Sequence, residues 1–183
     1  FAIWAKDSVE NIVVTDPVLG EIPSLSMQYA PFMPHLNRDL ILATAQDQGL
    51  EQDDETFIPV DGYPNGNFYY DSLNAIPNVS YIEGDLLIQN GNTVYGIIWV
   101  EGETIISADA TVEGILIQER SETTEIYGST ISNHISIRGM LITWNDVVGL
   151  GPQVHLEYDA DYVEDFINFV DVSNPPMRIL RWQ

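Results

Sequence analysis

The stretch YIEGDLLIQNGNTVYGII, residues 81–98, aligns without a gap with the eighteen residues that follow it, WVEGETIISADATVEGIL, residues 99–116. Across the two copies an apolar residue recurs every six positions, at Ile82, Ile88, Val94, Val100, Ile106 and Val112. A fixed period is typical of repeat proteins, in which each repeat stacks on the previous one. The sequence therefore predicts a short three-sided β-solenoid with eighteen-residue coils, whose interior these six side chains fill.

A third copy of the repeat follows at a longer spacing. IRGMLI, residues 137–142, repeats VEGILI, residues 112–117, twenty-five positions later, so we expect one coil to carry a seven-residue insertion. Glycines recur at fixed places in the copies, and glycine tolerates the backbone conformations that tight corners need. We expect the corners at Gly84, Gly96, Gly102, Gly114 and Gly139.

The regions that flank the repeats predict one or two helices and strands at both termini. In residues 35–49 the side chains of Leu36, Leu40, Ala43 and Ala45 are expected on one helix face, with Gly49 where the helix ends. Residues 159–170 predict a second helix, and residues 1–14 and 177–182 predict strands. We predict one mainly β domain over 1–183, made of an N-terminal strand, helix and loop region (1–76), the solenoid (77–144), and a C-terminal helix and closing strand (145–183).

The outward-facing side chains of the coils predict an apolar wall. Side chains alternate across a strand, so residues next to the interior positions face outward. Coils stacked eighteen residues apart then align Tyr81, Ile97, Trp99, Ile115 and Ile117. A continuous apolar patch needs a cover. We expect the helix of residues 36–46 or that of 161–170 to supply it, and the alternative is an interface with another subunit.

A second wall is acidic. Glu83, Glu101 and Glu119 are expected in one column, with Asp85 and Glu103 in the next. Neighbouring strands are ~4.8 Å apart, and like charges at that spacing destabilise a sheet unless they are screened. One interpretation is a solvated face adapted to a salty setting. The other is a Ca²⁺ site, because hard cations prefer several carboxylate oxygens.

The overall composition limits the partners and sites that we expect. Six Lys and Arg stand against 28 Asp and Glu, a formal net charge of −22. We expect no direct binding of nucleic acid, because such binding normally needs clustered basic side chains. The chain has no cysteine, hence no disulfide or thiolate metal site. Its apolar runs are shorter than the ~20 residues of a membrane span, so we expect membrane contact only through an N-terminal helix absent from this chain.

The sequence predicts neither catalytic residues nor a bound cofactor, apart from the calcium alternative. Some hexad-repeat proteins are acyltransferases that use a histidine base between subunits of a trimer. Among the three histidines only His134 lies near a plausible site, in the coil insertion, and no partner for it is evident.

Several segments together resemble the soluble part of PilX-like minor pilins, which take part in bacterial type IV pilus assembly. These segments are ATAQDQG, GYPNGNFYYDS, IPNVSYIEGDLLI, VYGIIWVEG, NHISIRGMLI, QVHLEYDADYV and PPMRILRWQ, which spread over about residues 30–183. The resemblance implies a non-enzymatic extracellular head of a minor pilin at the cell surface, structural or adhesive in role. Its implied partners are other pilin subunits or pilus tip components, and a surface or polysaccharide ligand. A head without its anchor is expected to be monomeric.

Two alternatives from other classes stay open. A bactofilin-like structural solenoid would polymerise through the bare edges of its coils. A hexad-repeat acyltransferase would form trimers and bind an acyl donor.

Overall fold

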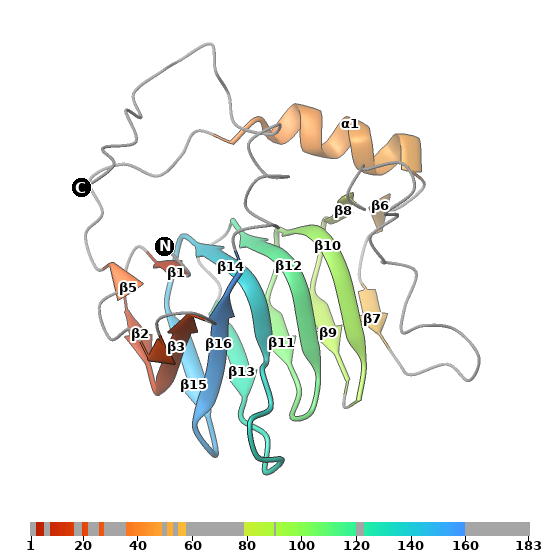
Figure 1. Cartoon of the computed structure of the whole chain (residues 1–183). Coiled ribbons are helices and arrows are strands. Elements are labelled where there is room, and N and C mark those ends of the chain that lie inside the picture. Colours follow the sequence, from red (N-terminus) through yellow and green to blue (C-terminus); the bar gives the residue numbers. More distant parts are fainter. Residues whose placement is uncertain are drawn as a thin grey trace.

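The computed structural model describes residues 3–5, 8–16, 20–21, 26–27, 36–48, 51–52, 55–57, 79–89, 91–119 and 123–159. Within these residues lie sixteen strands and one helix, so the structure is mainly β (Figure 1). The second predicted helix, the predicted closing strand 177–182 and His35 lie outside the described residues.

The strands form two sheets. The larger sheet contains β1 (Ile3–Ala5), β3 (Ile12–Asp16), β4 (Gly20–Glu21), β5 (Ser26–Met27), β6 (Glu51–Gln52), β8 (Val79–Ile82), β10 (Thr93–Val100), β12 (Thr111–Gln118), β14 (Ile137–Thr143) and β16 (Val154–Tyr158). The smaller sheet contains β2 (Val9–Glu10), β7 (Glu55–Phe57), β9 (Leu86–Ile88), β11 (Thr104–Ile106), β13 (Thr124–Tyr127) and β15 (Val147–Leu150). Among the described strands the pairs are parallel, apart from the antiparallel pair β3 and β4.

The strand order follows the sequence repeat. The larger sheet runs β4-β3-β16-β14-β12-β10-β8-β6, with β1 joined to β14, and the smaller runs β2-β15-β13-β11-β9-β7. Trp99 lies opposite Tyr81 and Val94 opposite Val112, so these strands pair residues eighteen positions apart. From β10 to β16 the chain alternates between the two sheets (Figure 1).

The insertion is divided between two connections. β12 and β14 pair Val112 with Ile137, which are twenty-five positions apart as the sequence predicts. In the smaller sheet Ile106 pairs with Ile126, twenty positions apart. Two of the seven additional residues therefore precede β13, and the other five follow it.

Glycines with positive φ lie in the middle of the three long strands. Gly96, Gly114 and Gly139 have φ values of 117°, 147° and 132°, and the register places them opposite one another. β14 pairs with β16 through residues 137–139 and with β1 through residues 141–143. The strand thus changes its neighbour at Gly139, which requires the larger sheet to bend there.

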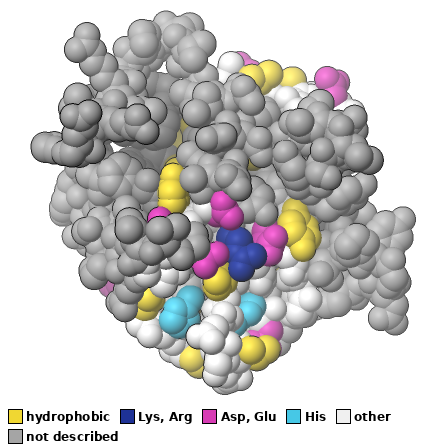
Figure 2. Space-filling view, viewed as in Figure 1, with side chains coloured by type: hydrophobic (Ala, Val, Ile, Leu, Met, Phe, Trp, Pro, Cys, Tyr) yellow, Lys and Arg dark blue, Asp and Glu magenta, His cyan; other side chains and the backbone are white. Residues whose placement is uncertain are grey.

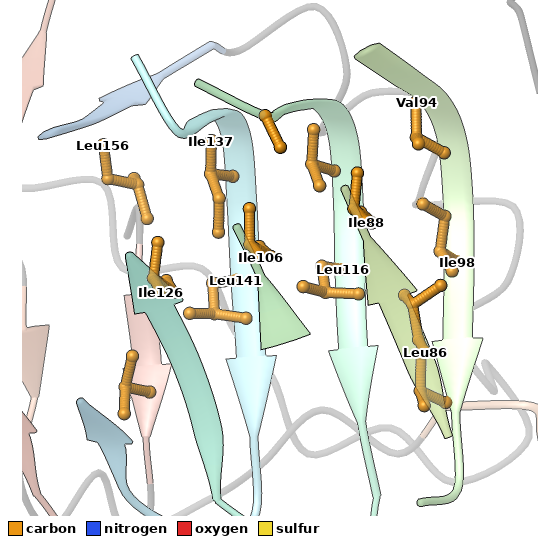
Figure 3. Close-up of a cluster of buried hydrophobic side chains, with 14 of the residues drawn as sticks. Leu86, Ile88, Val94, Ile98, Ile106, Leu116, Ile126, Ile137, Leu141 and Leu156 are labelled. Atoms are coloured by element: carbon orange, nitrogen blue, oxygen red, sulfur yellow. The ribbon is translucent and has the colours of Figure 1, made fainter. Parts of the chain in front are cut away.

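Aliphatic side chains fill the space between the sheets. The six residues with the period of six, Ile82, Ile88, Val94, Val100, Ile106 and Val112, belong to one buried cluster. In Figure 3 the side chains of Leu86, Ile88 and Ile106 lie among those of Ile98 and Leu116, from the other sheet. Full burial of one such side chain contributes about 1.5–3 kcal/mol, so this interior is the main source of stability.

The N-terminal strands lie at one end of the two sheets. β1, β2 and β3 pair with β14, β15 and β16, which places Ile3 opposite Leu141 and Val14 opposite Leu156. At the opposite end, β6 and β7 pair with β8 and β9 (Figure 1). Segments from the N-terminal third of the chain therefore cover both ends of the repeat region.

The helix α1 (Arg38–Gln48) begins after Asn37. The Asn37 side-chain oxygen accepts a hydrogen bond from the backbone N–H of Leu40 at 3.0 Å, the usual contact of a helix N-cap. Near the other end, the Gln48 side-chain oxygen accepts a 2.7 Å hydrogen bond from the N–H of Val79. Both ends of α1 are thus held by specific polar contacts.

The buried face of α1 differs from the predicted face. Ile41 and Ala45, four residues apart, are fully buried, whereas Leu40 is 41% exposed and Ala43 is also exposed. Residues four apart share a helix face, and Ile41 is larger than Ala43. The prediction is confirmed for Leu36 and Ala45 and was wrong for Leu40 and Ala43, because Ile41 packs on the sheet together with Ala45.

The helix covers the predicted apolar wall. Val79, Tyr81, Ile97, Trp99, Ile115, Ile117 and Ile142 form a second buried cluster together with Ile41 and Ala45 of α1. The expectation that residues 36–46 cover this wall is confirmed. The wall is therefore an internal contact of the chain.

Candidate functional site

Arg38 links the first turn of α1 to two strand ends of the larger sheet. Its guanidinium forms an ion pair with Glu101, and its Nε lies 3.3 Å from Oε2 of Glu119. The guanidinium carbon also lies 5.3 Å from the centre of the Tyr81 ring, a cation–π geometry. One basic side chain thus contacts three residues from three successive repeats.

Aromatic side chains complete this cluster. The rings of Tyr81 and Trp99 are stacked, with centres 6.2 Å apart and planes 9° apart. The Tyr81 hydroxyl donates a hydrogen bond to Glu101, and the Trp99 Nε1–H donates one to Glu119 at 3.1 Å. We call Arg38, Tyr81, Trp99, Glu101 and Glu119 the Arg38 cluster.

The electrostatics of the Arg38 cluster favour a neutral phenol beside a carboxylate. Burial raises the pKa of Tyr81, and the hydrogen bond to Glu101 raises it further, while the charge of Arg38 opposes the shift. The hydrogen bond to Glu101 raises the pKa of Arg38 as well. The cluster therefore holds its phenol and its guanidinium protonated, and neither group is a base near neutral pH.

The acidic column predicted from the sequence separates into different environments. Glu101 is 6% exposed and Glu83 is exposed at the surface. Asp85 is also exposed, and its Oδ1 accepts a 2.8 Å hydrogen bond from the backbone N–H of Glu103. Because Arg38 pairs with both Glu101 and Glu119, its positive charge reduces the repulsion between these two carboxylates.

The calcium hypothesis gains no support from this geometry. In the part of the chain that the structure describes, no group of three or more His, Asp or Glu side chains could hold a metal ion. The five candidates Glu83, Asp85, Glu101, Glu103 and Glu119 do not converge on one point there.

A second charged cluster lies on the outward face of the larger sheet. Arg138 on β14 donates from Nε to Glu157 on β16 at 2.9 Å and from Nη1 to Glu113 on β12 at 3.3 Å. Tyr95 on β10 is the next residue in this row, opposite Glu113. Figure 2 shows a basic side chain among acidic ones on this face, with histidines nearby.

The inserted residues between β13 and β14 are attached to the previous turn of the chain. Ser129 Oγ donates a hydrogen bond to Asp109, and the backbone N–H of Ile131 donates to Ser129 Oγ at 2.9 Å. His134 Nε2 lies 3.0 Å from the carbonyl oxygen of Ala110. Ser129 pairs with the carboxylate of Asp109 and His134 with a backbone carbonyl, so these contacts tie the insertion to the preceding turn without forming a serine–histidine pair.

Neither Arg38 nor Arg138 was predicted as a site residue. Only six basic residues occur in this acidic chain, so each is a candidate for pairing with the carboxylate columns. Arg138 stands one residue before Gly139 inside a repeat, which places it in register with Glu113. Arg38 carries no such signal, because it lies outside the repeats.

Comparison of the chain with protein-family models, with curated proteins and with solved structures found no match. The one helix within the described residues, α1, is not long and apolar enough to cross a membrane.

Proposed function

We propose that the two sheets together form a three-sided β-solenoid with one enlarged coil. The eighteen-residue register of β8, β10 and β12 supports this description. The change of partner along β14, from β16 to β1, supports a third side, because it divides the larger sheet at Gly139. One coil would then comprise the second half of a long strand, a short strand and the first half of the next long strand.

We propose that this chain is the non-enzymatic extracellular head of a minor pilin, with a structural or adhesive role. The observation that supports the proposal is that the charged and polar clusters pair with other parts of the same chain. Arg38 and Arg138 connect different elements of the same chain, and Asp109 and Ser129 hold the inserted loop. These side chains join elements of one chain to each other, and this use favours a structural role.

The proposed partners are other pilin subunits or pilus tip components, and a surface or polysaccharide ligand. The row of Tyr95, Glu113, Arg138 and Glu157 offers a ring and several polar groups on neighbouring strands. The net charge of −22 favours an environment in which salt screens the repulsion. The likeness of several segments to PilX-like minor pilins supplies the link to a type IV pilus.

Deletion of the gene in its native host tests this function. Electron microscopy of the cells is expected to show fewer surface filaments, and immunogold labelling of the complemented strain is expected to place the protein outside the cell. Complementation with a Gly151→Ala variant should restore filaments, because a Cβ at Gly151 meets no atom within 4 Å and its positive φ alone costs about 1–2 kcal/mol. A Gly139→Ala variant should fail, because its Cβ would overlap the backbone of Gly114.

Unchanged filament numbers after deletion would overturn the pilus proposal. Long end-to-end polymers of the purified chain in negative stain would favour the bactofilin-like alternative. Trimers that bind an acyl donor would favour the acyltransferase alternative.

A further inference from the structure

Among the described residues, the strands β1 to β5 form a unit whose pairing with the rest of the chain is to β14, β15 and β16. Within the unit, β1 pairs with β5 and β3 pairs with β4. Outside it, β1, β2 and β3 pair with β14, β15 and β16. We call β1–β5 the N-terminal unit, and we call the edge formed by β14, β15 and β16 the acceptor edge.

Specific contacts fix the N-terminal unit on the acceptor edge. Asp146 Oδ1 accepts hydrogen bonds from the backbone N–H and the hydroxyl of Ser8, at 2.9 Å and 2.6 Å. The Asn11 side chain donates to the carbonyl of Gly149 at 3.1 Å. A Cβ at Gly149 would lie 3.0 Å from the carbonyl carbon of Asn11 and closer to its oxygen. The edge therefore accepts this segment in one register, and a side chain at position 149 would obstruct it.

Apolar side chains add the main attraction. Ile3 and Ala5 are fully buried, and Val14 is 6% exposed. The three residues belong to the cluster between the sheets, together with Leu141 and Leu156 of the acceptor edge. Without the N-terminal unit, this end of the interior and the main-chain groups of β14, β15 and β16 would face water, as in any unprotected edge.

These contacts join residues that are distant along the chain. Ser8 and Asp146 are separated by 138 positions, and nine residue steps separate Met27 of β5 from Leu36 before α1. Nine extended residues span about 30 Å. A connection of that reach allows the N-terminal unit to meet an acceptor edge of its own chain or that of another molecule.

We propose that the acceptor edge is a binding site for the N-terminal unit of a second copy of this chain. In the exchanged form β1, β2 and β3 of one molecule pair with β14, β15 and β16 of its neighbour. Exchange of an identical element forms the same contacts in a new pair of molecules, so its energetic cost is low. This inference goes beyond the pilus proposal and does not depend on it.

Cysteine pairs in this cysteine-free chain test the exchange. Glu10 on β2 and Val148 on β15 are direct partners in the smaller sheet, and both side chains reach the surface. Neighbouring strands are ~4.8 Å apart, within the Cα separation that a disulfide accepts. The full-length Glu10→Cys and Val148→Cys variants are prepared separately, concentrated together with warming, and then oxidised. The expected product is a disulfide-linked heterodimer with twice the 20.5 kDa mass of the chain.

A matched pair controls for random collision. Glu125 on β13 is the partner of Val148 on its other side, so Glu125 lies two strands from Glu10. The mixture of Glu10→Cys and Glu125→Cys should give about tenfold less heterodimer, because only seated strands hold two thiols at the millimolar effective concentration of a linked pair.

A Glu10→Cys/Val148→Cys double variant completes the design. In one chain this pair should form an internal disulfide and stay monomeric in light scattering, and reduction should restore exchange. Failure to form that internal disulfide would overturn the register of the acceptor edge. An internal disulfide in the double variant, with no heterodimer above the Glu125→Cys control in the mixture, would overturn the exchange and leave the pilus proposal untouched.

Discussion

Gly139 lies directly against the backbone of Gly114: a Cβ atom on Gly139 would stand 2.9 Å from the Gly114 carbonyl carbon and closer still to its oxygen. Gly114 lies against Gly96 in the same way. The three glycines thus form a column in which each backbone occupies the space of the missing side chain.

Gly139→Ala is expected to destabilise the protein by about 3 kcal/mol or more, since a strained backbone conformation and an overpacked contact each cost about 1–3 kcal/mol. Gly151→Ala is the matched control, because Gly151 also has a positive φ, 79°, but has open space around it. Urea denaturation of both variants measures the difference. Equal losses would contradict the close packing of the glycine column.

Arg38→Ala is expected to lower the free energy of unfolding by about 1–3 kcal/mol, because it leaves the buried carboxylate of Glu101 without its cation. Arg138→Ala changes the net charge equally but affects a partly exposed row, with Glu113 and Glu157 each more than 20% exposed in their side chains. Its expected loss is under about 1 kcal/mol. A larger loss for Arg138→Ala in thermal or chemical denaturation would contradict this ranking.

We expect the protein to lose stability at alkaline pH because of the Tyr81 phenol. Burial and the bond to Glu101 raise the pKa of Tyr81 above its ordinary value of 10.0, so the folded state keeps a proton that the unfolded chain releases. The contribution is complete below pH 10 and decreases as the pH rises above it, by up to about 1.4 kcal/mol per pH unit. Tyr81→Phe should flatten this decrease in melting curves between pH 9 and pH 11.

At neutral pH, Tyr127→Phe is the matched control for the loss of the Tyr81 hydroxyl itself. Tyr127 is 39% exposed and hydrogen-bonds to Glu125 at the surface, so its removal should change stability far less than the removal of the buried Tyr81 hydroxyl. An unchanged alkaline slope in Tyr81→Phe would show that other groups govern it.

Salt is expected to raise the melting temperature. With a net charge of −22, the acidic side chains repel one another. Raising the ionic strength from about 0.01 M to 1 M shortens the screening length from about 30 Å to 3 Å. Calorimetry in NaCl and in CaCl₂ at matched ionic strength separates general screening from a specific cation site. We expect equal melting temperatures, because Arg38 already lies between Glu101 and Glu119. A further rise in calcium would restore the cation hypothesis.

The repeat made the register of the central strands predictable. Trp99 between Tyr81 and Ile117, and Val112 opposite Ile137, follow from counting eighteen and twenty-five positions. The helix face was less accessible, because Leu40 and Ile41 are both apolar and only tertiary packing selects Ile41. The position of β1, β2 and β3 had no signal of this kind, since their partners lie about 138 positions away and outside the repeat period. The contacts of Arg38 depend on where α1 lies on the sheet, and tertiary packing decides that position, so the sequence did not predict them.

The pairing of β1, β2 and β3 with β14, β15 and β16 has a consequence for biosynthesis. A ribosome produces the segment 3–16 long before its partner strands, which are complete only once Tyr158 has been made. β1, β2 and β3 therefore stay unpaired with these strands while more than 140 residues are translated, and Ile3 and Val14 are exposed to water or bound by a chaperone during that time. Closing such a long loop late favours slow folding, so we expect the final docking step to follow translation of the whole repeat region.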